Sequence, residues 1–143
     1  MIDCFYGLLY FAMVFAFAFA MGIARTLLVA PTIGPTAAVL LEIPVILAAS
    51  WLVARRLLRN RSFVSSQCAI MGTTAFVLTM ISEAAFSHLL RGQSVAQWAG
   101  TLGTPLGLIG LTGQFGFAAM PLFARGVGRP AGMRQVPKER PEK

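Results

Sequence analysis

Four long apolar runs dominate the sequence, and short segments rich in charge, proline or glycine separate them. The runs cover about residues 5–24, 35–54, 66–90 and 104–123. A helix of roughly 20 apolar residues crosses the ~30 Å hydrocarbon core of a bilayer. The first run alternates Phe and Ala as a strand would, but a lone strand cannot pair its backbone groups in lipid. The pattern therefore predicts an all-α, polytopic membrane protein with four transmembrane helices in a compact bundle.

The composition excludes a water-soluble domain. Of the 143 residues, 57% are hydrophobic and only 12% are charged, which is too few polar groups to cover a soluble surface. There is no charge between Asp3 and Arg25, and Glu83 is the only charge between Arg61 and Arg91. The net charge of +7 lies in the short segments between and after the runs, so we expect no nucleic-acid partner.

The distribution of basic residues predicts the orientation. The segment between the second and third runs and the start of the C-terminal segment are basic, with Arg55, Arg56, Arg59, Arg61, Arg125 and Arg129. The other two connections carry one arginine each, Arg25 and Arg91. Basic residues favour the cytoplasmic side, so both termini are predicted to be cytoplasmic, with these arginines on anionic headgroups of a bacterial inner membrane. Residues 1–124 form the predicted transmembrane domain, and residues 125–143 a basic, disordered tail.

Two acidic residues fall inside the apolar runs. Glu42 lies seven residues into the second run, and Glu83 seven residues before the end of the third. Because these runs are antiparallel, both lie about 10 Å deep on the side where Arg25 ends the first run. The expected polar cluster contains Arg25, Glu42, Glu83 and His88. We interpret it first as a structural clamp, while a proton or cation site and a quinone or lipid-headgroup contact stay open.

Prolines and small residues suggest kinks and close packing. Pro44 and Pro121 each remove a helix hydrogen bond and are predicted kink sites. Small residues at helical spacing allow close helix approach, within the bundle or to another subunit, and Gln114 is expected to hydrogen-bond across helices. This predicted packing set is Ala12, Ala16, Ala20, Ala24, Gly103, Gly107, Gly110, Gly113 and Gln114.

No motif for catalysis or metal binding stands out. The sequence has no glycine-rich phosphate loop, no HExxH, no CxxC and no GxSxG. One histidine and two cysteines have no metal-ligand spacing, so no metal and no cofactor is expected. An enzyme with this sequence would have to use Glu42 or Glu83 as its acid or base. No catalytic residue is assigned.

Residues 22–50 carry a spaced pattern of glycine, arginine, proline and glutamate. This stretch resembles a group of small, uncharacterised bacterial four-helix inner-membrane proteins. The resemblance implies a fold and a location but no activity. Small multidrug-type transporters also have four helices and an essential glutamate, but in their first span, where this chain has no acid. The matching positions are Gly22, Arg25, Pro31, Gly34, Glu42, Pro44 and Ser50.

Two functional hypotheses follow. The first is a non-catalytic membrane protein that self-associates or serves as an accessory subunit of a larger membrane complex, with the Arg/Glu cluster as a clamp. The alternative is a small dimeric proton-coupled transporter that uses Glu42 and Glu83. The expected partners are the bilayer with its anionic headgroups and either further copies of the chain or a larger membrane-protein complex.

Overall fold

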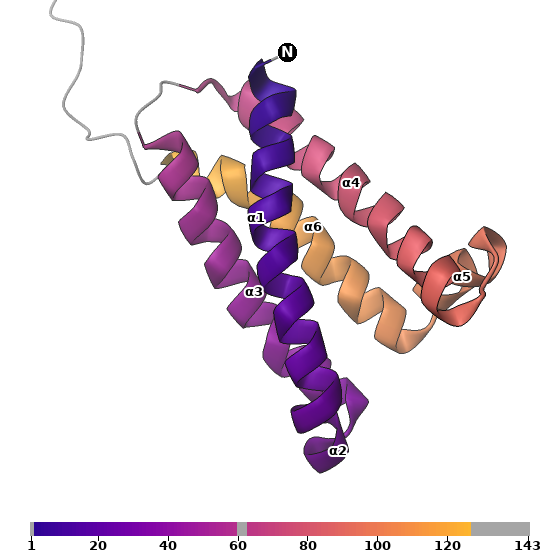
Figure 1. The fold of residues 1–143 in the computed structure, drawn as a ribbon. Helices are drawn as coiled ribbons and strands as arrows, with labels where there is room; N and C mark the ends of the chain where they lie inside the picture. The colour runs from indigo at the N-terminus through magenta and orange to yellow at the C-terminus, as the bar shows by residue number, and fades with distance from the viewer. Residues whose placement is uncertain (1, 60–62, 127–143) are drawn as a thin grey trace, which may run out of the picture.

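The computed structural model describes residues 2–59 and 63–126, and in this part of the chain every element is helical (Figure 1). The elements in chain order are α1 (Ile2–Ala24), the π-helix η1 (Arg25–Val29), α2 (Ala30–Ile33), α3 (Pro35–Leu58), α4 (Ser65–Arg91), α5 (Val95–Leu102) and α6 (Pro105–Gly126).

Within the described residues, four helical stretches are long and apolar enough to cross a membrane: Cys4–Ile33, Pro35–Leu58, Ser65–Arg91 and Pro105–Gly126. The predictions of an all-α chain and of four apolar helices are therefore confirmed, and they indicate a multi-pass membrane protein. Three of the helices extend beyond the predicted runs at their charged ends, because arginines are good helix formers.

The four long helices pack in a ring, in which α1 and α6 each contact both α3 and α4. Figure 1 shows the start of α1, the end of α3, the start of α4 and the end of α6 together at one end, which we call the closed end. The opposite end, with α2 and α5, is called the open end, and there α2 and α5 do not contact each other.

The buried core lies toward the closed end. Tyr10 of α1 and Met71 of α4 are fully buried, and Phe117 of α6 is nearly so. The Tyr10 ring stacks on Phe117 at 4.8 Å between centroids, and its hydroxyl donates to the Phe117 carbonyl oxygen at 2.8 Å. This contact joins α1 to α6 across the ring.

Glycines let the helices approach at two interfaces. A Cβ built on Gly72 of α4 would lie 2.0 Å from the carbonyl oxygen of Ala118 in α6. A Cβ on Gly7 of α1 would lie 2.8 Å from the Cβ of Thr74 in α4. Neither glycine belongs to the predicted packing set.

The predicted alanine stripe on α1 does not pack within the chain. Ala12, Ala16 and Ala20 are exposed, and Ala24 is half-buried. The face of α1 that packs instead carries Gly7, Tyr10 and Val14. Ala12 comes two residues after Tyr10, and Ala16 two residues after Val14. Two residues correspond to about 200° around a helix, so both alanines point away from the other helices.

The glycines of the predicted packing set in the fourth run contact different parts of the structure. Gly103 caps the end of α5 and precedes α6, so Gly103 and Gly107 do not share one helix face as the dimer pattern requires. A Cβ on Gly107 would lie 2.1 Å from the carbonyl oxygen of Thr101 in α5, and one on Gly113 would lie 3.3 Å from Ile43 of α3. Around Gly110 there is no atom within 4 Å of that position.

The predicted loop after residue 24 is helical up to Ile33. The π-helix η1 and the short α2 continue α1, and Gly34 alone separates α2 from α3. Gly34 has φ +85°, which favours glycine, and Pro35 opens α3 where its missing N–H costs no hydrogen bond. Pro31 cannot donate to the preceding turn, which gives a physical reason for the wider π-helical turn before it.

The predicted loop between the third and fourth runs contains the helix α5. The Ser94 side chain accepts from the Gln97 N–H at 3.3 Å, and the Gln97 side chain accepts from the Ser94 N–H at 2.8 Å. This capping box begins α5 two residues after Gly92, which ends α4 in the left-handed conformation. The Thr104 hydroxyl caps α6 by accepting from the Gly107 N–H at 3.1 Å.

Neither predicted kink proline ends its helix. Pro44 lies exposed inside α3, and Pro121 lies buried inside α6.

The arginines that the structure describes in the basic segments lie at the closed end. Arg55 and Arg56 are in the last turn of α3, where Arg55 lies over the Trp51 ring at 5.1 Å, and Arg59 follows that helix. Arg125, in the last turn of α6, donates to the Ser65 hydroxyl. The predictions for Arg61, Arg129 and the tail beyond Gly126 lie outside the described residues.

Candidate functional site

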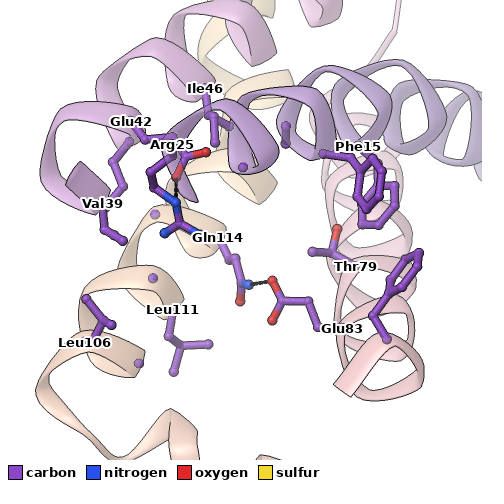
Figure 2. A pocket seen from close by; sticks show the side chains of 18 of the residues that line it. Phe15, Arg25, Val39, Glu42, Ile46, Thr79, Glu83, Leu106, Leu111 and Gln114 are labelled. Carbon is purple, nitrogen blue, oxygen red and sulfur yellow. Dashed lines mark hydrogen bonds and ion pairs between the residues drawn. The ribbon is translucent and has the colours of Figure 1, made fainter. Parts of the chain in front are cut away.

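A cavity of about 760 Å³ lies between the long helices toward the open end. Its lining comes from α1, η1, α3, α4, α5 and α6 and is mostly apolar. The charged side chains among its lining residues are Arg25, Glu42, Glu83 and Arg91. Three of the four predicted cluster residues therefore line this cavity: Arg25 from η1, Glu42 from α3 and Glu83 from α4 (Figure 2).

Arg25 and Glu42 form an ion pair between η1 and α3. The Arg25 Nε lies 3.2 Å from the Glu42 Oε2, and the two side chains are 33% and 11% exposed. Gly22 of α1 lies beside this carboxylate, since a Cβ built there would be 3.9 Å from the Glu42 Oε1, an ordinary van der Waals contact. The first residue of the π-helix, directly after the end of α1, thus ties the first helical stretch to α3.

Glu83 pairs with an amide side chain and not with a cation. Its Oε1 accepts a hydrogen bond from the Gln114 Nε2 of α6, and no ion pair joins Glu83 to any residue that the structure describes (Figure 2). The Gln114 Oε1 is buried and has no donor among these residues. The two carboxylates therefore do not share Arg25: one is paired with a cation, and the other with a neutral amide.

His88 does not join the polar cluster. It lies exposed near the end of α4, and its Nδ1 is 3.0 Å from the carbonyl oxygen of Gln93. The neighbouring Ser87 is buried and donates to the Gln93 side chain. His88 is five residues after Glu83, about 140° around the helix, so it faces away from the cavity while Glu83 faces into it.

Stacked aromatic side chains form one wall of the cavity. Phe86 of α4 lies 6.1 Å from Phe15 and 5.6 Å from Phe19 between ring centroids, and both phenylalanines belong to α1. Trp98 of α5 and the pair Leu106 and Leu111 of α6 line other parts. Toward the closed end the cavity reaches Val14 and Phe117, which belong to the buried core.

The sequence prediction missed Gln114 as the partner of Glu83, although a signal was present. Glu83 lies eight residues before the end of α4, and Gln114 nine residues after the start of α6. Antiparallel neighbours bring such positions to similar depth. What the sequence could not supply is the rotation of α4 and α6, which turns both side chains toward the same cavity.

Other chemistry-bearing side chains do not gather into a site in the described residues. No three or more His, Cys, Asp or Glu side chains lie close enough there to hold a metal ion. Cys4 is exposed near the start of α1, and Cys68 is buried in the core.

Comparison with protein-family models, with curated proteins and with solved structures found no match to this chain. The function is therefore argued from the arrangement of its own residues.

Proposed function

We propose that this chain is a non-catalytic integral protein of a bacterial inner membrane, a compact four-helix transmembrane bundle with both termini in the cytoplasm. Its four apolar helices support the membrane setting. The orientation is supported by the position of Arg55, Arg56 and Arg125 at the closed end, against Arg25 and Arg91 toward the open end.

The observation that carries the proposal is the Arg25–Glu42 ion pair. A carboxylate in a membrane span is costly unless a partner meets its charge, and here the partner belongs to the same chain. The pair joins η1 to α3 at the position where α1 gives way to the π-helix. It therefore acts as a clamp that fixes the first two spans against each other.

The proposed role is that of a self-associating protein or an accessory subunit of a larger membrane complex. The face of α1 with Ala12, Ala16 and Ala20 supports this, because it is exposed and its small residues would let another transmembrane helix approach closely.

A proton-coupled transporter is the second candidate, and one observation favours it: Glu42 and Glu83 line the same cavity. The packing of Tyr10, Met71 and Phe117 at the closed end weighs against a continuous path. Native mass analysis of the gently solubilised protein tests the accessory role, because a complex with a larger membrane protein supports it. A homodimer without partners fits both a self-associating protein and the transporter. Loss of proton flux in liposomes with Glu42→Gln or Glu83→Gln would then favour the transporter.

The clamp is tested by removing either charge. Arg25→Gln and Glu42→Gln should each lower the free energy of unfolding by about 1–3 kcal/mol, between the values for exposed and buried pairs. The double variant Arg25→Gln/Glu42→Gln should lose less than the sum of the two, since no charge is left unpaired. The measurement is unfolding in detergent micelles or bicelles.

Arg91→Gln is the matched control, because Arg91 lines the same cavity but forms no ion pair within 4.0 Å in the described residues. Two results would refute the clamp. One is an equal loss of unfolding free energy in Arg91→Gln and Arg25→Gln. The other is a loss in the double variant that equals the sum of the two single losses.

A further inference from the structure

Glu83 and Gln114 present hydrogen-bond acceptors to the cavity that the chain itself does not satisfy. A carboxylate and an amide oxygen can only accept. The single hydrogen bond between the two residues runs from the Gln114 Nε2 to the Glu83 Oε1. It leaves the buried Gln114 Oε1 without a donor from any described residue. The part of the cavity wall formed by Glu83 and Gln114 therefore fits a ligand group that carries several hydrogen-bond donors.

The charges around the cavity indicate the sign of that group. Arg25 of η1 and Glu42 of α3 neutralise each other. Arg91 lies eight residues beyond Glu83 on α4, about 12 Å along the helix and toward the open end. The cavity lining from α1, α5 and α6 has no charged side chain. The charge of Arg91 acts on Glu83 at longer range but forms no ion pair with it. Glu83 is thus the one carboxylate of the lining with no cation within 4.0 Å among the described residues, and a positively charged group complements it.

The remaining walls indicate the rest of the ligand. Phe15, Phe19 and Phe86 offer stacked aromatic rings beside Glu83's own helix, and most of the other lining side chains are aliphatic. A volume of about 760 Å³ falls in the range of small-molecule sites. Aromatic faces also attract cations.

We propose that the cavity binds a lipophilic amine, with its apolar body against the phenylalanines and its protonated amine donating to Glu83 and to the Gln114 Oε1. An ammonium group supplies both the positive charge and the N–H donors that this wall lacks. A quaternary cation would supply only the charge, and an anion neither. The inference rests on the proposed membrane bundle for its setting, but it does not depend on the Arg25–Glu42 clamp.

The test is isothermal titration of the purified full-length protein in detergent micelles with 1-adamantylamine. The matched probes 1-adamantanol and 1-adamantanecarboxylate keep the apolar body and change only the polar group. We expect the amine to bind at least ten times more tightly than either. Equal binding of the amine and the alcohol would overturn the proposal with the wild-type protein alone, whatever the variants do.

Two variants then locate the site. Glu83→Gln keeps a similar shape and should weaken amine binding at least tenfold, with unchanged micelle partitioning. Phe86→Leu should also weaken binding, whereas Phe115→Leu should not, because Phe115 stacks on Phe76 outside the cavity lining. Unchanged amine affinity in a folded Glu83→Gln protein would refute the site. A failure here leaves the clamp measurements on Arg25 and Glu42 unaffected, so the two proposals fail separately.

Discussion

Two glutamates that line the same cavity have different surroundings in this protein. Glu42 meets Arg25 of the preceding helical stretch, while Glu83 meets the amide of Gln114. That both lie in the halves of their helices nearer the open end could be predicted from the sequence, because this follows from counting residues along a helix. The partner of Glu83 could not, because it depends on how α4 and α6 are rotated against each other.

At the residue scale, the closest helix contact leads to a prediction for Gly72. An alanine Cβ there would lie 2.0 Å from the Ala118 carbonyl oxygen, so α4 and α6 would have to move apart. Overpacking of this kind costs about 1–3 kcal/mol. Gly72→Ala should therefore lower the free energy of unfolding, measured in micelles or bicelles.

Gly110→Ala is the control for this prediction. It too lies inside a long helix, but its Cβ would meet no atom within 4 Å. The substitution should leave stability unchanged or raise it by up to about 1 kcal/mol through helix propensity. An equal increase in the free energy of unfolding of Gly72→Ala and Gly110→Ala would show that α4 and α6 are not in close contact at Gly72.

At the element scale, the sequence predicts the long helices better than the short ones. The four long helices follow from hydrophobic length alone. The start of α5 could be predicted from Ser94 and Gln97, the two residues of its capping box. The hydropathy pattern does not show it. No residue type by itself predicts the π-helix η1, because Pro31 fits an irregular connection between the first two runs equally well.

The capping box makes α5 a local unit that one substitution should loosen. Ser94→Ala removes the acceptor for the Gln97 N–H and should cost about 0.5–2 kcal/mol, which is about a 2- to 30-fold loss of hydrogen-exchange protection in α5. The rest of the chain should keep its protection. Ser66→Ala, at an exposed serine of α4, is the control; a similar loss in α5 from that variant would contradict the local role of Ser94.

At the scale of the whole molecule, packing and charge are arranged along the same axis. The buried side chains Tyr10, Met71 and Cys68 lie toward the end that also carries Arg55, Arg56 and Arg125, and the cavity lies toward the other end. The sequence predicted that the basic residues that end the second and fourth runs lie at the same end of the molecule. It did not predict the cavity, because an unfilled space depends on the mutual tilt of helices that each look uniformly apolar.

The proposed orientation predicts from which side Cys4 can be labelled. Of the two cysteines, Cys4 is exposed and Cys68 is buried. A membrane-impermeant maleimide should label Cys4 in inverted membrane vesicles and not in intact spheroplasts, because the N-terminus is cytoplasmic in the proposed topology.

The converse experiment introduces a cysteine on α5. Gly100→Cys in a Cys4→Ala background should react in spheroplasts, since the open end faces outward in that topology. A Cβ at Gly100 meets no atom within 4 Å, so the substitution should not disturb the fold. Labelling of Cys4 in intact spheroplasts would reverse the orientation.

The one-residue connection at Gly34 limits how the chain can change by insertion or deletion. Arg25 and Glu42 are 17 residues apart, and all but one of the residues between them are helical. A single added or lost residue would rotate Glu42 by about 100° and shift it by about 1.5 Å relative to Arg25. Chains that share this ion pair should therefore keep its 17-residue spacing even where their side chains diverge, and length variation should collect outside residues 25–42.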